Sequence, residues 1–117
     1  MIAIPIKLNR EDSAVAPLFG KAKWFAFVED GKISIEKNET QSGSDVVHWL
    51  VEKGVKALVM QKMSQPPYQM IKEEGSITVF YIGSGRILLT EAIKRYENES
   101  LVIVDDSNVD EIIKIKR

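Results

Sequence analysis

Residues 24–36 read WFAFVEDGKISIE, and this stretch carries the clearest structural signal in the sequence. Two β-prone runs, 24–28 and 33–36, flank the pair Asp30-Gly31. Asp-Gly tolerates the positive φ angles of a type I′ turn, so the stretch predicts an antiparallel hairpin. The hairpin supplies two strands around which the rest of the chain can be placed.

The segment before the hairpin predicts one strand and one long loop. Residues 2–6 form a short apolar run typical of a buried strand, in which Pro5 fits only near a strand end or an edge-facing position. Residues 7–23 show no periodicity, and loops longer than about 12 residues are usually functional or disordered. Because this loop carries Val15, Leu18 and Phe19, we expect it to pack against the body of the protein.

The segment after the hairpin alternates helices and strands. A helix is predicted from about Ser44, whose hydroxyl can cap the first turn, to Gly54. Residues 55–60 are typical of a strand that is buried on both faces. A second helix is predicted between Ser64 and Gly75, with Pro66 and Pro67 in its first turn.

The chain then continues with a third strand-to-helix unit. Residues 77–81 are β-prone, and Gly83-Ser84-Gly85 is expected to turn the chain into a helix from Arg86 to about Glu97. Residues 101–104 are a candidate late strand, and residues 109–117 a short charged helix or edge segment.

This order of elements predicts an α/β fold with a five-stranded mixed sheet and about three helices. The hairpin forms an antiparallel part, and the strand-helix-strand units form a parallel part with right-handed crossovers. The ribonuclease H-like motif has this order. At 117 residues the chain is expected to form a single domain, 1–117.

Composition narrows the functional classes. Sixteen basic and 17 acidic side chains leave a net charge of -1, without the basic footprint of a nucleic-acid-binding protein. There is no apolar stretch of about 18 residues and no signal-peptide pattern at the N-terminus, so we expect no membrane partner and a cytoplasmic location. The absence of cysteine excludes disulfides, a thiol nucleophile and clusters held by this chain's own thiolates.

Several motifs resemble a known family. The loop contains Val-x-Pro-x-Phe-Gly-basic-Ala at residues 15–22, followed by aromatic Trp24-Phe25, and Glu91-Ala92 lies in the last helix. Over about residues 1–96, these features resemble the dinitrogenase iron–molybdenum cofactor biosynthesis family, a NifX-type domain related to nitrogen fixation. The core would then be residues 1–97, and 98–117 a C-terminal extension.

The resemblance implies a ribonuclease H-like fold that binds or carries the iron–molybdenum cofactor or its iron–sulfur precursors. The sequence departs from the family at Leu18, where histidine is common. His48 is the single imidazole of the chain. It is either a ligand for such a cluster or a surface residue of a helix, since one histidine supplies one ligand where transition-metal sites usually need three or four.

Other candidate binding residues gather where strands end. Ligands of open α/β sheets settle outside the carboxyl ends of parallel strands. The residues expected at this rim are Asn9, Phe19, Gly20, Lys21, Ser64, Gly83, Gly85 and Arg86. Backbone N–H groups at Gly83–Arg86 could hold an anion at a helix start, or these residues could form only a tight turn.

Nothing in the sequence indicates an enzyme. A ribonuclease-type nuclease needs inward carboxylates on its strands, and residues 2–6 contain none. No serine is accompanied by a positioned base. Shared topology therefore does not carry the nuclease chemistry.

Two functions follow from these observations. The first is a non-catalytic binding or carrier domain for a metal cluster or small anion at the strand-end rim. The alternative is a degenerate family member that acts as a protein-interaction or regulatory module. Its partner would be a second copy or a cofactor-assembly protein, contacted through Trp24, Trp49 or Tyr68 or through an edge strand.

Overall fold

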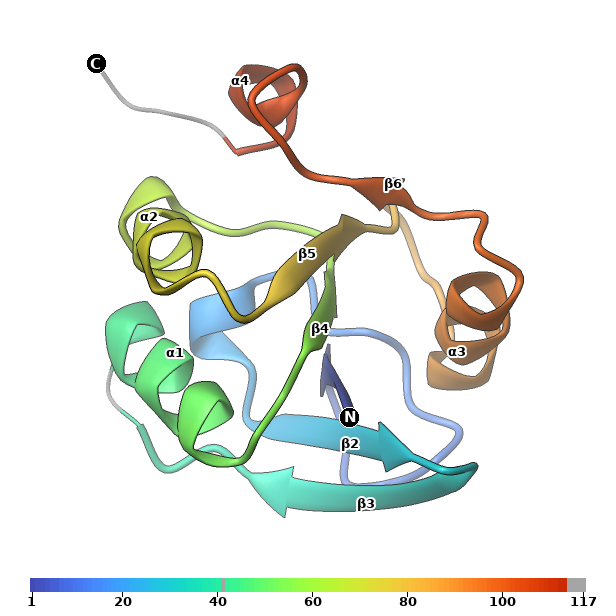
Figure 1. The fold of residues 1–117 in the computed structure, drawn as a ribbon. Helices are drawn as coiled ribbons and strands as arrows, with labels where there is room; N and C mark the ends of the chain where they lie inside the picture. Colours follow the sequence, from blue (N-terminus) through green and yellow to red (C-terminus); the bar gives the residue numbers. More distant parts are fainter. Residues whose placement is uncertain (41, 114–117) are drawn as a thin grey trace.

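The chain folds around one mixed sheet with helices on both faces (Figure 1). The computed structural model describes residues 1–40 and 42–113. The sheet has six strands in the order β3-β2-β1-β4-β5-β6. The strands are β1 (Ile2–Ile6), β2 (Trp24–Glu29), β3 (Lys32–Lys37), β4 (Ala57–Met60), β5 (Thr78–Tyr81) and β6 (Val102–Ile103). The helices are the 3-10 turn η1 (Phe19–Lys21), α1 (Gly43–Glu52), α2 (Gln65–Glu74), α3 (Leu89–Glu97) and α4 (Val109–Ile112).

The predicted hairpin is confirmed as β2 and β3. Asp30 and Gly31 have φ angles of 52° and 76°, which are the two positive values that a type I′ turn requires. β2 also pairs antiparallel with β1, whereas β1 pairs parallel with β4 and β4 parallel with β5. The α/β, ribonuclease H-like class expected from the sequence is therefore the fold observed.

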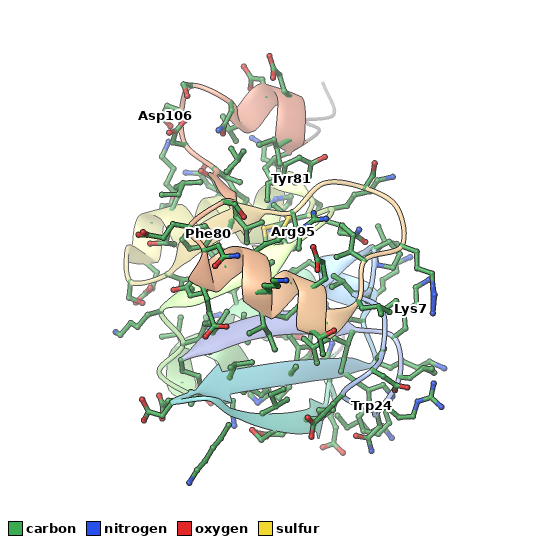
Figure 2. All side chains as sticks on the ribbon, turned by 90° about the vertical axis from the view of Figure 1, so that its right-hand side faces the viewer. Lys7, Trp24, Phe80, Tyr81, Arg95 and Asp106 are labelled. Carbon is green, nitrogen blue, oxygen red and sulfur yellow. The ribbon has the colours of Figure 1, made fainter. Side chains whose placement is uncertain are left out.

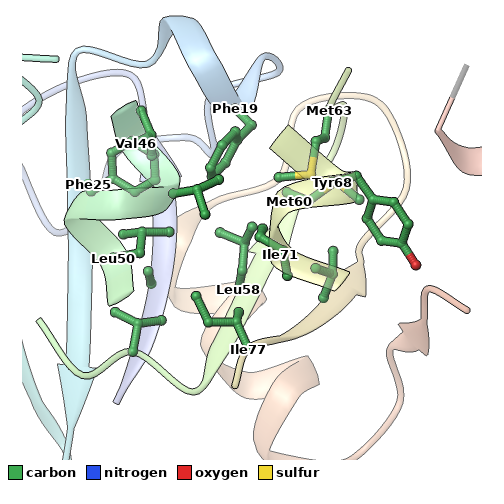
Figure 3. Close-up of a cluster of buried hydrophobic side chains, with 14 of the residues drawn as sticks. Phe19, Phe25, Val46, Leu50, Leu58, Met60, Met63, Tyr68, Ile71 and Ile77 are labelled. Atoms are coloured by element: carbon green, nitrogen blue, oxygen red, sulfur yellow. The ribbon is translucent and has the colours of Figure 1, made fainter. Parts of the chain in front are cut away.

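Each face of the sheet has its own apolar core, because neighbouring residues of a strand point to opposite faces. Leu58 and Met60 belong to the core under α1 and α2, together with Phe19, Phe25 and Leu50 (Figure 3). The intervening Val59 belongs to the core under α3. All of β4 is buried, as the sequence predicted.

The long loop fills the space where two central strands separate. β1 pairs with β4 only at Ile2 and Ala3, so Pro5 disrupts no bond to β4. Residues 13–16 take the free edge of β1, where the Ala16 N–H donates to the Pro5 carbonyl at 2.8 Å. On the other side, the Val15 N–H donates to the Ile87 carbonyl at 2.7 Å. The loop packs against the body as expected, although Leu18 remains 45% exposed.

Two helix starts differ from the sequence expectation. α1 begins at Gly43, and its cap is Ser42 instead of Ser44; the Ser42 hydroxyl accepts from the Asp45 N–H at 3.2 Å. α3 begins at Leu89 and not at Arg86. Residues 87–89 instead pair with residues 13–15, which holds them extended. α2 ends as predicted at Gly75, whose φ is 84°.

The C-terminal segment adds a strand to the five expected. β6 pairs antiparallel with Phe80 and Tyr81 of β5. The chain then forms α4, which corresponds to the start of the element expected at 109–117; residues 114–117 lie outside the described part. In the described part, no helix is long and apolar enough to cross a membrane.

Candidate functional site

A cavity lies at the carboxyl ends of β4 and β5. It has a volume of about 480 Å³. Its walls come from η1, the start of α1, the β4–α2 connection, the end of β5 and α4. The lining residues are Leu18, Phe19, Gly20, Lys21, Ser42, Gly43, Gln61, Lys62, Met63, Ser64, Tyr81, Ser84, Glu111 and Ile112.

The inner part of this cavity is apolar and its rim is polar. Phe19 is 1% exposed and Met63 is 6% exposed, and both belong to the core under α1 and α2. Lys21 and Lys62 are exposed at the rim. A ligand would therefore contact apolar side chains at the buried end of the cavity and two cationic side chains at its exposed end.

Hydrogen bonds attach the η1 wall to the end of β4. The Phe19 N–H donates to the Lys62 carbonyl at 3.0 Å, and Leu18 forms a parallel bridge with Lys62. The Phe19 ring packs edge-on against Phe25, with centroids 5.9 Å apart. These contacts fix the neighbouring Lys21 backbone relative to β4.

Two glycines allow η1, α1 and α2 to meet beside the cavity. A Cβ on Gly20 would lie 3.1 Å from the Gly43 Cα, and a Cβ on Gly43 would lie 3.1 Å from the Pro67 Cγ. Both distances are shorter than ordinary van der Waals contacts between carbons. The elements η1, α1 and α2 can therefore lie this close together only because Gly20 and Gly43 have no side chain.

The two helices that begin at the cavity differ in their free donors. α1 offers backbone N–H groups in its first turn, with the Ser42 cap. α2 has prolines at positions 66 and 67, which carry no N–H. Anion binding through a helix N-terminus is therefore weaker at α2 than its position at the cavity suggests.

The buried side chain of Gln61 positions the loop that follows β5. Gln61 is 5% exposed, and its Nε2 donates to the Gly85 carbonyl at 2.7 Å. Gly83 and Gly85 have φ angles of 92° and 94°, which glycine adopts without steric cost. The loop is thus a fixed turn that places Ser84 at the cavity.

The structure brings together some of the residues expected at the site. Phe19, Gly20, Lys21 and Ser64 line the cavity. Gly83, Gly85 and Arg86 flank it without lining it, and they do not form a helix start because α3 begins at Leu89. The helix start expected at Gly83–Arg86 is therefore wrong, and anion binding by these residues stays a prediction that would have to rely on the backbone of a turn.

Asn9 and His48 lie apart from these residues. Both are exposed, and neither is among the lining residues of the cavity. His48 lies on α1, whose buried residues are Val46, Val47 and Leu50.

The aromatic residues considered for a partner surface are less available than expected. Tyr68 is 7% exposed, and burial raises the pKa of its hydroxyl. Trp24 and Trp49 are partly buried, and the Trp49 ring packs edge-on against Phe25 and Phe27. Figure 2 shows Trp24 at one end of the sheet, far from the α4 segment.

Sequence reasoning missed several lining residues. The strand-end rule could have indicated Lys62 and Tyr81, which follow or end the parallel strands. Glu111 and Ile112 come from the C-terminal segment, and the sequence contains no pattern that places them beside β4.

A polar network fastens this C-terminal segment. The Asp105 carboxylate accepts from the N–H and hydroxyl of Ser107, at 2.8 and 2.5 Å, and these bonds lower its pKa. Asp106 pairs with Lys72 of α2 at 2.5 Å, and this hydrogen bond raises the pKa of Lys72 (Figure 2 labels Asp106).

The donor set does not fit direct coordination of a metal cluster. The chain has no cysteine, and His48 is outside the cavity. Among residues 1–40 and 42–113, no three His, Asp or Glu side chains form a group that could hold a metal ion. Met63 offers a single thioether, which belongs to the apolar core.

The strand order and the position of this cavity at the strand ends define a small ribonuclease H-like α/β domain. The sequence identifies the family: residues 1–99 match the dinitrogenase iron–molybdenum cofactor family, and the chain belongs to it.

Solved structures of other proteins share this fold. An NMR structure of a NifB-like protein of the DUF35 family from Thermotoga is 25% identical, with a TM-score of 0.72 over 87% of this chain and 90% of that one. The apo orange protein of Desulfovibrio gigas is 20% identical, with a TM-score of 0.75 over 88% and 91% of the two chains. Among the curated proteins, no sequence matches this chain.

Proposed function

We propose that this protein is a non-catalytic binding domain that holds a compact anionic ligand in the strand-end cavity. The observation that carries the proposal is the pair Lys21 and Lys62 at the rim of an apolar hollow. The family and the NifB-like neighbour suggest a metal cluster, or an iron–sulfur precursor of one, as the cargo.

Charge and hydrogen-bonding groups of the cavity support an anion over a cation. The described lining residues include two lysines, Lys21 and Lys62, and one carboxylate, Glu111. Ser42, Ser64 and Ser84 add hydroxyl groups that can donate to ligand oxygens or sulfides.

A cluster would be held through its own charge and shape. This chain supplies no thiolate, so iron would keep ligands that came with the cluster or from a second protein. Exposed charge pairs contribute about 0.2–1 kcal/mol each and are screened by salt. Binding is therefore expected to weaken as ionic strength rises.

Anaerobic uptake of a chromophoric cluster tests the proposal. Protein is incubated with ferrous iron, sulfide and molybdate, desalted, and examined by visible absorbance and metal analysis. We expect uptake by the wild type, weaker uptake by Lys21→Ala/Lys62→Ala, and no change in Lys94→Ala, a control on α3. His48→Ala is also expected to retain uptake, because the imidazole lies outside the cavity.

Two results would contradict the proposal. One is no uptake of cluster, and no shift in melting temperature with molybdate or phosphate. The other is uptake that His48→Ala abolishes while the double lysine variant retains it, which would place the ligand on the outer side of α1.

A second candidate function is protein interaction through the sheet edge. Val102 and Ile103 of β6 are 51% and 50% exposed, and an edge strand leaves backbone groups unpaired. A homodimer by sedimentation that Ile103→Lys dissociates would support this function. A strict monomer at high concentration would count against pairing between two copies.

A further inference from the structure

The C-terminal segment contributes to the cavity although it lies beyond the family match. The match ends at residue 99, whereas Glu111 and Ile112 line the cavity. Figure 1 shows α4 following β6 at one end of the sheet, on the side of α2. The segment therefore adds a wall that the family-like core alone does not have.

Buried anchors fix this wall in place. Val104 is 6% exposed and Ile113 is 0% exposed, and both belong to the core under α1 and α2. The Val104 N–H donates to the Val79 carbonyl at 2.9 Å. Because anchors lie on both sides of Glu111 and Ile112, these residues have a defined position beside the cavity.

Glu111 is the only carboxylate among the described lining residues. None of the ion pairs between described residues involves it. An ionised carboxylate accepts hydrogen bonds and donates none. A ligand group next to Glu111 is therefore favoured if it is a donor and disfavoured if it is another anion.

We infer that residues 104–113 form the specificity wall of the site. Glu111 selects ligands that carry a hydrogen-bond donor, such as an ammonium or hydroxyl group, in addition to the anionic group that faces Lys21 and Lys62. A second anionic group next to Glu111 is disfavoured by charge repulsion, whereas the anionic group that lies at Lys21 and Lys62 is not, and Ile112 limits the apolar space. This inference rests on the proposed function, because it assigns the ligand class of the same cavity.

A matched pair of small probes tests the selection. Phosphoethanolamine and 2-phosphoglycolate both carry a phosphate, with an ammonium group on one and a carboxylate on the other. Dissociation constants are measured by NMR titration of wild type, Glu111→Gln and Asp110→Asn. Asp110→Asn removes the same charge from α4 at an exposed residue that does not line the cavity.

The wild type is expected to prefer phosphoethanolamine by about fivefold, which corresponds to ~1 kcal/mol for one exposed charge. Glu111→Gln should lose most of this preference, chiefly through tighter binding of 2-phosphoglycolate. Asp110→Asn should keep the preference. Thermal unfolding of each variant confirms that the fold is intact.

Different results overturn different statements. If both probes bind, Lys21→Ala/Lys62→Ala weakens both, and the wild type shows no preference, the specificity wall is wrong and the anion site stands. The same holds if Asp110→Asn and Glu111→Gln reduce the preference equally. If neither the wild type nor any variant binds either probe, both the anion site and its specificity wall are wrong.

Discussion

Replacing Gly20 by alanine would test whether the walls of the cavity depend on close backbone contact. The new Cβ would lie 3.1 Å from the Gly43 Cα and 3.3 Å from the Gly43 nitrogen. Both are backbone atoms, so relief requires η1 and the start of α1 to move apart by a few tenths of an ångström. Overpacking of this kind costs about 1–3 kcal/mol.

Gly43→Ala is the matched control for this substitution. Its Cβ would lie 3.1 Å from the Pro67 Cγ, which belongs to a side chain. Gly43 is also the first residue of α1, where alanine is favoured over glycine by at most the ~1 kcal/mol of a helix interior. The steric cost and the helix gain oppose each other, so the free energy of unfolding should change little.

Urea unfolding followed by tryptophan fluorescence measures both variants. The rings of Trp49 and Phe25 have centroids 5.6 Å apart, so the fluorescence of Trp49 is expected to change when the core unfolds. With an m-value of about 1–3 kcal/mol per molar urea, a loss of ~2 kcal/mol lowers the midpoint by roughly 1 M. The reasoning is refuted if Gly20→Ala unfolds at the wild-type midpoint, or if Gly43→Ala loses more stability than Gly20→Ala.

Three further substitutions address the core, the hairpin and the C-terminal network. Leu50→Ala, at a fully buried residue of α1, should lower the free energy of unfolding by about 2–5 kcal/mol in the same urea assay, whereas a loss below 1 kcal/mol would mean that the site collapses. Gly31→Ala should cost about 1–2 kcal/mol because the turn holds φ at 76°, and Gly31→Asn should cost less; equal losses would contradict the turn assignment. The folded pKa of Asp105 is lowered by Ser107, so ionised Asp105 stabilises the segment above its unfolded pKa, and this stabilisation is lost as pH falls through the folded pKa. NMR signals of residues 104–108 should therefore shift in acid at a pH below the usual range of an aspartate, and the loss of this response in Asp105→Asn would confirm its source.

Local rules predicted the elements whose structure depends on neighbouring residues. Asp30-Gly31 determined the hairpin through its tolerance of positive φ, and Gly75 ended α2 for the same reason. The buried strand β4 was evident from its uninterrupted apolar run. The rule that ligands bind at the carboxyl ends of parallel strands indicated the end of the sheet at which the cavity lies. This rule does not require the exact position of each residue.

The remaining features depend on contacts between distant residues. The start of α3 is delayed because Ile87 bonds to Val15, and no pattern near residue 86 reveals that partner. Likewise, Glu111 reaches the cavity through the anchors Val104 and Ile113, whose burial depends on the tertiary structure. His48 was a candidate ligand because of its imidazole alone. It lies on the exposed side of α1 and therefore does not line the cavity.

The backbone bonds that join Val15 to Ile87 also bear on the order of folding. They close a loop that includes most of the chain, and the entropy of closing long loops slows such contacts. The β2–β3 hairpin closes a short loop and needs no distant partner. We therefore expect the hairpin to form early, and the cavity, which depends on the long loop and the C-terminal segment, to be assembled late. Substitutions that weaken the cavity walls should then accelerate unfolding while leaving the folding rate nearly unchanged.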